Sequence, residues 1–387
     1  MLDRLSVGEL PRKHHLALRD ASGKLRYEHC ITRAGFEGPY TIAYHEHRPQ
    51  ALVASGEAFA NPCHPVEAPH SVFSRRHFCT PRLEHAVSLS SRVPLLFNEQ
   101  LTLSLAKPTT PESYYRTNGT ADELWFVLDG NGTLRCPLGD LDYTAGDYLF
   151  VPKGLLHRLL PNDEVSHNLL VLEFRGGVGI PPRFRNPVGQ LRMDAPYSHR
   201  DFKRPSFSGP LDEGLRNVHV ELGPRAQVFA YEHSPLDVVG WDGTLYPWGF
   251  PILNFQPRVS SVHLPPSWHG TFEGAGALVC SFVPRPLEFH PEAVPCPYPH
   301  SSADVDEVIF YVAGQFSSRS GVSRGSLTWH PAGVPHGPQP GRYEASLGVK
   351  QTDELAVMLD CQAPLKATEQ ARAIEDHSYE ASFTDHS

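Results

Sequence analysis

The feature that most constrains the fold is a sequence pattern that occurs twice. In the first half, Glu123 stands seven residues before a glycine, and GDYLFVPKGLLH follows at 146–157. In the second half, Glu307 stands seven residues before a glycine, and GSLTWHPAGVPH follows at 325–336. Both copies fit E-x6-G followed by G-x5-P-x-G-x2-H. Two ordered copies with the same internal spacing indicate that the chain contains an internal duplication.

Short strand-like segments surround both copies of the pattern. Each is rich in β-branched or aromatic residues and ends at a glycine or proline. They cover 101–107, 123–130, 147–152, 168–176, 251–255, 277–284, 307–314 and 326–333. The 37 prolines and 31 glycines fit strands joined by many turns, because both residues disfavour helix interiors. We therefore predict an all-β fold, with one short C-terminal helix within 365–376.

A stretch rich in proline, glycine and arginine, 177–215, separates the two copies of the pattern. We predict that it links two domains. The first, 1–176, would comprise an N-terminal arm and one β domain. The second, 216–387, would comprise the other β domain and the C-terminal helix.

Composition excludes some classes of partner. The chain has 34 lysines and arginines against 43 acidic residues, a net charge of −9, which disfavours nucleic acid and anionic membranes as main partners. Its seven cysteines are scattered and include no CxxC pair, which favours reduced thiols. No apolar stretch is long enough to span a bilayer, and the N-terminus lacks a signal-peptide core. We expect a soluble, cytoplasmic protein.

The second copy of the pattern carries the candidate metal ligands. Glu307 begins one predicted strand, and His336 follows a Pro-x-Gly turn that begins another. Both side chains can therefore point into one opening. His300 stands seven residues before the glutamate. Two imidazoles and one carboxylate, with other positions open, suit a non-haem Fe(II) that activates oxygen. A salt bridge between Glu307 and His300 without a metal is the alternative.

The first copy lacks one of these ligands. It keeps Glu123 and His157, but Arg116 replaces the histidine seven residues before the glutamate. Because a guanidinium repels a cation, we expect this half to be structural.

The two patterns are those of the cupins, and the chain resembles a bicupin with two jelly-roll β-barrels. The full cupin pattern has one more histidine, five residues before the glutamate. This chain has Asn118 there in the first copy and Ser302 in the second.

Three longer segments resemble the homogentisate 1,2-dioxygenase family, Fe(II) enzymes that cleave aromatic rings in tyrosine breakdown. They are SPLDVVGWDGTLYPWGFPILNF at 234–255, the stretch 280–316, and GSLTWHPAGVPHGP at 325–338. The family's three iron ligands fall on His300, Glu307 and His336. The resemblance implies Fe(2+) as cofactor, O2 and a small aromatic diol acid as substrates, and a homo-oligomer.

The resemblance also suggests further site residues. A family histidine thought to act as acid–base after V-V-x-W is Asp242 here, and a family tyrosine that touches substrate is Phe316. His330 matches a family histidine that supports the ligands and is predicted to assist catalysis. His336 is predicted to contact substrate as well as metal. Trp241 is predicted to line an aromatic pocket, although a place in the core suits it equally.

His269 lies on a loop where it could replace the missing base, but we expect it at the surface.

Three functions fit these residues. The leading one is an Fe(II)-dependent ring-cleaving dioxygenase acting on homogentisate or a similar 1,4-dihydroxy aromatic acid. The alternatives are a metal-dependent cupin isomerase or hydrolase, and a non-catalytic cupin binding protein. Ser302, in place of a fourth ligand, weighs against the isomerase or hydrolase.

Overall fold

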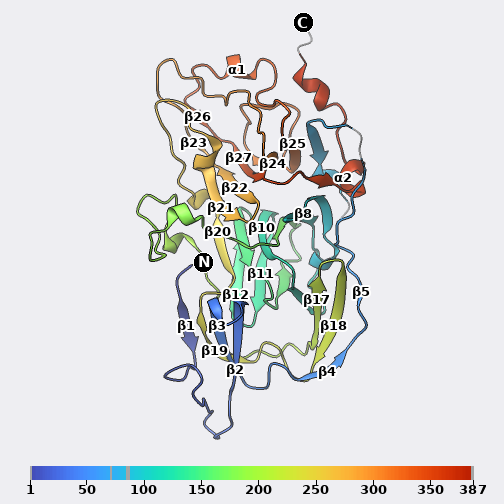
Figure 1. The fold of residues 1–387 in the computed structure, drawn as a ribbon, viewed down its shortest axis with the longest axis vertical. Helices are drawn as coiled ribbons and strands as arrows, with labels where there is room; N and C mark the ends of the chain where they lie inside the picture. Colours follow the sequence, from blue (N-terminus) through green and yellow to red (C-terminus); the bar gives the residue numbers. More distant parts are fainter. Residues whose placement is uncertain (1, 70–71, 84–87, 385–387) are drawn as a thin grey trace.

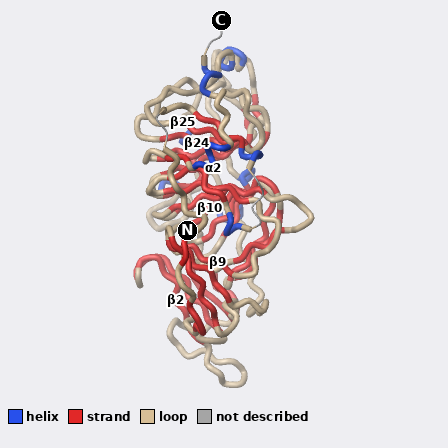
Figure 2. The backbone as a smooth tube through the Cα atoms, turned by 90° about the vertical axis from the view of Figure 1, so that its right-hand side faces the viewer, coloured by secondary structure: helices blue, strands red, loops and turns tan. Residues whose placement is uncertain are grey.

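The computed structural model describes residues 2–69, 72–83 and 88–384, and its regular structure is mostly β. The described residues form two main sheets of seven strands each, and each sheet contains the glutamate of one copy of the sequence pattern. This confirms the predicted all-β bicupin architecture. Figure 2 shows β24 (Asp306–Ala313) and β25 (Ser326–His330) of the second main sheet above β10 (Asp122–Asp129) of the first, with β2 (Tyr27–Ala34) at the opposite end of the molecule.

The first main sheet contains Glu123. Its strands, in spatial order, are β20 (Trp248–Pro251), β13 (Asp147–Val151), β10 (Asp122–Asp129), β15 (Asn168–Phe174), β8 (Leu101–Ala106), β7 (Val93–Phe97) and β28 (Lys366–Ala367).

The second main sheet contains Glu307. Its strands, in spatial order, are β16 (Val178–Gly179), β21 (Gly270–Gly274), β22 (Ala277–Phe282), β27 (Leu355–Cys361), β24 (Asp306–Ala313), β25 (Ser326–His330) and β6 (Arg76–Cys79).

The two main sheets confirm the internal duplication. In the first, the run β13-β10-β15-β8-β7 places the glutamate strand β10 between β13 and β15. In the second, β25-β24-β27-β22-β21 places β24 between β25 and β27 in the same way. Every neighbouring pair within these two runs is antiparallel. The repeated sequence spacing therefore corresponds to a repeated strand order.

The two halves exchange their outer strands. β20, from the second half of the chain, pairs with β13, and β28 pairs with β7. In return, β6 from the first half pairs with β25, and β16, from the predicted linker, pairs with β21. Each main sheet is thus flanked on both sides by strands that lie beyond its own half. The predicted division at 177–215 stays a prediction, and strand pairing crosses it in both directions.

The halves also share one hydrophobic core. Tyr148 of the first main sheet packs its ring 5.4 Å from that of Phe272 in the second, and its hydroxyl lies 2.9 Å from Ser281 Oγ. A single cluster of buried apolar side chains includes residues of both main sheets. Because burial of apolar surface is the main stabilising contribution to a fold, we expect the halves to unfold together.

Smaller sheets complete the fold. They are β12 (Gly139–Thr144), β11 (Asn131–Cys136) and β14 (Arg158–Pro161); β1 (Leu5–Gly8), β19 (Val238–Gly243), β3 (Glu37–His45) and β2 (Tyr27–Ala34); β4 (Leu52–Ser55), β18 (Arg225–Tyr231), β17 (Asn217–Leu222) and β9 (Tyr115–Asn118), with β5 (Phe59–Ala60) on β18; and β23 (Arg285–Pro286) with β26 (Gln351–Thr352). Figure 1 shows that β1–β4 and β17–β19 gather at one end of the molecule, away from β24 and β25.

Most predicted elements are found, with small shifts at their ends. The segment 251–255 is an exception, because strand β20 ends at Pro251 and a 3-10 turn, Ile252–Asn254, follows. The C-terminal helix α2 spans only Glu369–Ala373, and α1 (Arg342–Ala345) was not predicted. The seven cysteines are free, as expected. In the described part of the chain, no helix has the length and apolar character to cross a membrane.

Candidate metal centre

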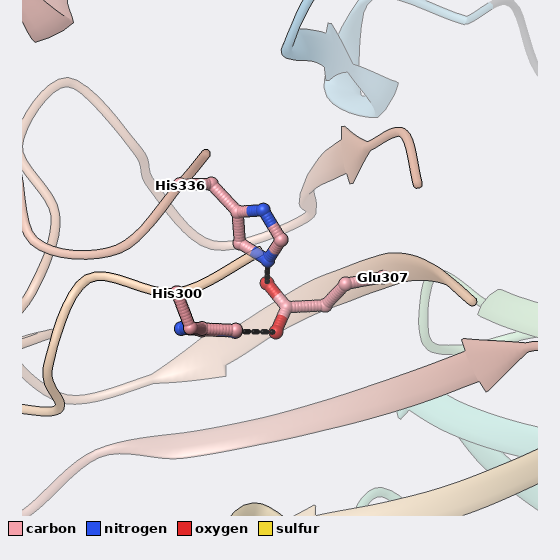
Figure 3. A group of neighbouring side chains, drawn as sticks. All are labelled: His300, Glu307 and His336. Atoms are coloured by element: carbon pink, nitrogen blue, oxygen red, sulfur yellow. Dashed lines mark ion pairs between the residues drawn. The ribbon is translucent and has the colours of Figure 1, made fainter. Parts of the chain in front are cut away.

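His300, Glu307 and His336 come together at one end of the second main sheet (Figure 3). Glu307 is near the start of β24, whereas the two histidines lie on loops that precede β24 and follow β25. The loops are joined by an antiparallel bridge, in which His300 N donates to His336 O at 2.7 Å and His336 N donates to His300 O at 2.8 Å. This pair of hydrogen bonds fixes the two imidazoles beside the carboxylate.

The hydrogen bonds of the two imidazoles show which ring nitrogen of each histidine is available to bind a metal. His300 Nδ1 lies 3.1 Å from the carbonyl of Tyr298, and His336 Nδ1 lies 2.8 Å from that of Val334. Because a carbonyl only accepts, both Nδ1 atoms carry a proton, and in the neutral imidazoles that bind a metal the lone pair is on Nε2. The Nε2 atoms lie 3.7 Å and 3.8 Å from the Glu307 oxygens, beyond good hydrogen-bond length.

This arrangement fits a bound cation. His336 Nε2 is buried and has no hydrogen-bond partner, so its lone pair is unsatisfied by the protein. Two lone pairs facing a carboxylate repel one another unless a positive charge lies between them. The ligand atoms of His300, Glu307 and His336 all lie within 4.8 Å of one another. Among the residues that the structure describes, no other group of three meets this criterion.

The Glu307 carboxylate is hydrogen-bonded to His330, its register partner on β25. His330 Nδ1 lies 2.7 Å from Glu307 Oε1, and Tyr379 Oη lies 3.0 Å from His330 Nε2. Burial opposes ionisation of Glu307, but the nearby imidazole of His300 and the hydrogen bond with His330 hold the pKa of Glu307 well below the usual range. Burial lowers the pKa of His330 to about 4, so this imidazole is neutral at pH 7.

A neutral His330 can donate from Nδ1 to Glu307 and accept from Tyr379 at Nε2. Partners of this kind orient metal ligands and tune their basicity. His330 does not line the pocket in front of the triad. We therefore describe it as a positioning residue, and its predicted catalytic role stays a prediction.

A pocket opens in front of His300 and Glu307, and its walls combine apolar and polar side chains. Phe316 lines it, with its ring 4.5 Å from that of Tyr311. Phe282 and Met358 add further apolar surface. The predicted contact between Phe316 and substrate is compatible with this position and stays a prediction.

The structure places Asp242 and Trp241 elsewhere, on β19 in the sheet with β1 and β3. Arg4 Nη2 donates to Asp242 Oδ2 at 2.6 Å, and hydrogen bonds led by that of Arg4 lower the pKa of Asp242. Trp241 is fully buried, and its Nε1 donates to the carbonyl of Leu138 at 2.9 Å. Neither residue lines the pocket at the metal centre.

The predictions for Asp242 and Trp241 are therefore not supported. The reason is that β19 pairs with strands of the N-terminal arm and not with the second main sheet. Sequence proximity to 251–255 and resemblance to the family did not reveal this pairing.

Sequence reasoning missed several pocket residues. His263 Nδ1 lies 2.9 Å from Glu288 Oε1, and both line the pocket. His269, expected at the surface, is buried and lines the same pocket, and its Nδ1 has no partner. Burial lowers the pKa of His269 to about 3. Arg319, also buried, completes this group. These residues lie in connecting segments without a periodic pattern, and of them the sequence analysis considered only His269.

The first half has a guanidinium in the corresponding place. Arg116 Nη2 lies 2.6 Å from Glu123 Oε1, and Arg116 Nη1 lies 3.2 Å from His157 Nε2. Arg116 Nε also donates to Glu221 Oε1 at 2.7 Å. All of these side chains are buried. The positive charge of Arg116 thus occupies the position expected for a metal, which agrees with the prediction that this half is structural.

Comparison with known proteins places the chain in a family. No family model matches it. A candidate dioxygenase of Saccharolobus solfataricus is 33% identical over 381 residues, which cover 97% of this chain and 97% of that protein. Homogentisate 1,2-dioxygenase of Rhizobium etli is 26% identical over 289 residues, which cover 68% of this chain and 62% of the enzyme.

The chain belongs to the homogentisate 1,2-dioxygenase-related family. Within this family, the homogentisate 1,2-dioxygenase of Bradyrhizobium diazoefficiens is 26% identical over 69% of this chain and 61% of the enzyme. The chain thus spans less than two thirds of the length of these named homogentisate 1,2-dioxygenases. A cupin 2 conserved barrel domain protein from Leptotrichia buccalis resembles 76% of this chain and 98% of its own, at 10% identity and a TM-score of 0.34.

Proposed function

We propose that the protein is an Fe(II)-dependent dioxygenase that cleaves the ring of homogentisate or a similar 1,4-dihydroxy aromatic acid. The observation that carries the proposal is the ligand set of His300, Glu307 and His336. Two imidazole nitrogens and one carboxylate oxygen converge there, and the pocket lies on the open side. Membership of the homogentisate 1,2-dioxygenase-related family supports the same reaction class.

In this proposal the two Nε2 atoms and the Glu307 carboxylate hold the iron. Bound Fe(II) would supply Lewis acidity and the electrons for oxygen activation. His330 and Tyr379 keep the carboxylate oriented through the hydrogen bonds described above. The bridge between His300 and His336 keeps the two imidazoles at a fixed separation.

His263 is the pocket residue best suited to move a proton. Its Nδ1 faces the Glu288 carboxylate, which only accepts when it is ionised, so the proton lies on Nδ1 and Nε2 has a free lone pair. This lone pair can accept a proton from a ring hydroxyl. Glu288 then stabilises the imidazolium, as a carboxylate does in other histidine-based proton transfers.

The apolar pocket walls have a second role. Phe282, Phe316 and Met358 surround the space in front of the triad. Apolar walls accommodate the flat faces of an aromatic ring and exclude water from the reacting groups. A homo-oligomer, by likeness to the family, and a cytoplasmic location, in keeping with the scattered free thiols, are part of the same proposal.

Oxygen consumption tests this function. The protein is purified without oxygen, reconstituted with Fe(II), and supplied with homogentisate, gentisate or hydroquinone in turn. We expect uptake with at least one of these diols and its loss in His336→Ala. If iron binds stoichiometrically and none of the three draws oxygen, the proposal is wrong for this class of substrate.

A further inference from the structure

The charged groups that line the pocket fall into pairs, with one exception. Arg285 lies 2.8 Å from Glu354, and His263 lies 2.9 Å from Glu288. Arg258 is 3.8 Å from Asp194 and packs over the ring of Trp268. Glu307 belongs to the metal centre. Arg319 remains, and it forms no ion pair with any residue in the described ranges.

Arg319 is nevertheless deeply buried, with 5% of its surface exposed. Its Nη1 donates to the carbonyls of Ser318, at 3.2 Å, and Gly337. The hydroxyl of Tyr379 lies close to the guanidinium, and the ring of Phe383 lies 5.7 Å from Cζ. Nε is buried and has no hydrogen-bond partner. These contacts are dipoles and a ring face, and none carries a formal negative charge.

A buried guanidinium without a carboxylate is costly, because arginine cannot lose its proton and burial removes the stabilising water. Glu307 does not offset this cost in the working protein. The Glu307 carboxylate is hydrogen-bonded to His330 and faces the metal position. A divalent cation there would outweigh the single negative charge of the carboxylate. The pocket with its metal therefore has an excess of positive charge, and Arg319 contributes a full unit of it.

We propose that Arg319 is the anchor for the carboxylate of the substrate, so that the pocket selects aromatic acids over neutral diols. The proposal rests on the proposed function, which it deepens by naming the residue that binds the acid group of the substrate. A guanidinium offers a planar set of donors that matches a carboxylate, and such charge-assisted pairs are strong inside a dry pocket. Arg319 lines the same pocket as His300 and Glu307, so one ligand can reach both the anchor and the metal.

The test measures binding and does not require turnover. Calorimetry under nitrogen, on the Fe(II)-loaded protein, compares phenylacetate with phenylacetamide, its neutral isostere. We expect the acid to bind at least roughly 10-fold more tightly than the amide. In Arg319→Met the affinity for the acid should fall by roughly 10- to 100-fold while that for the amide stays the same, and Arg319→Lys should recover part of the difference.

Two further variants serve as controls. Arg258→Met removes a pocket arginine that already has an acidic neighbour, so the preference for the acid should persist. His336→Ala disrupts the metal centre, so persistence of the preference there excludes binding of phenylacetate through the metal alone. Thermal melts verify that each variant is folded.

The proposal is overturned if the wild-type protein binds acid and amide equally, which needs no variant. It is also overturned if folded Arg319→Met keeps the preference, or if His336→Ala abolishes it. Because binding is measured apart from oxygen uptake, the two proposals can fail separately. A preference that depends on Arg319, without uptake of oxygen, supports the anchor and rejects the dioxygenase. Uptake of oxygen without a preference for the acid supports the dioxygenase and rejects the anchor.

Discussion

Arg116 in the first half occupies the position that His300 occupies in the second. Each is joined by an antiparallel backbone bridge to the histidine that closes its copy of the pattern, His157 in one case and His336 in the other. Each also stands beside the glutamate seven residues further on. The same framework thus holds a guanidinium in one half and a candidate metal site in the other.

Replacing Arg116 should destabilise the protein strongly. Arg116→Met leaves Glu123 and Glu221 buried without this cation, and removing one partner of a buried ion pair costs about 3–5 kcal/mol. Urea unfolding of the variant against wild type measures the loss. A matched surface change, Arg192→Met, removes an exposed ion pair with Asp194 and should cost less than about 1 kcal/mol. Equal stability of the two variants would contradict this account.

The same network predicts how stability depends on pH. Burial alone would raise the pKa of Glu123, but the charge of Arg116 outweighs it and lowers the pKa to about 2 from an ordinary 4.5. The unfolded chain therefore binds the proton more readily than the folded one between these values. The stability that Glu123 contributes is fully present above about pH 4.5 and is lost as the pH falls toward about 2.

Urea midpoints at pH 7, 5, 4 and 3 test this dependence. We expect the contribution of the network to stay constant from pH 7 to 5 and stability to fall steeply between pH 4 and 3. A Glu123→Gln variant, which cannot titrate at this position, should show a shallower decline below pH 4.5. A wild-type decline of the same slope would show that other carboxyl groups dominate.

Metal content should depend on the second half alone. His336→Ala removes one of three ligands, and we expect the iron-to-protein ratio measured after reconstitution and desalting to fall from near one toward zero. His157→Ala makes the matched change in the first half, where Arg116 occupies the site, and should leave the ratio unchanged. Loss of iron in both variants would indicate that the first half also binds metal.

His330 and Tyr379 should affect the metal through Glu307. His330→Gln removes a buried hydrogen bond to the ligand carboxylate, and loss of such a partner lowers metal affinity by roughly 10- to 100-fold. Tyr379→Phe removes the outer hydrogen bond to His330 and leaves the bond between His330 and Glu307 in place, so its effect on metal affinity should be smaller. Competition with a chelator, followed by metal analysis, ranks the three proteins. An unchanged affinity in His330→Gln would mean that Glu307 does not need this partner.

Asp242 should be dispensable for chemistry. Asp242→Asn weakens its ion pair with Arg4, which is partly exposed, so the cost should be about 1 kcal/mol or less. Oxygen uptake per bound iron should match that of wild type, whereas His263→Gln, at the pocket, should reduce the maximal rate. A large loss of rate in Asp242→Asn with iron still bound would restore the acid–base role that the family resemblance implied.

The sequence by itself determined the duplication, the all-β class and the three candidate ligands. These features depend on short-range spacing, since a glutamate at the start of a strand and a histidine after a Pro-x-Gly turn keep their relation wherever the strand packs. His300, Glu307 and His336 lie within 37 residues of one another, and the local strand pairing brings them together.

Only the tertiary structure decided which distant residues join them. Asp242 would lie at the metal centre only if β19 joined the second main sheet. Instead, β19 pairs with β1 and β3, and the next strand in the chain, β20, pairs within the first main sheet. The segments that bring His263 and His269 to the pocket have no periodic signal. Which of them shares a pocket with the metal is set by packing between elements far apart in the chain, and local spacing carries no information about that packing.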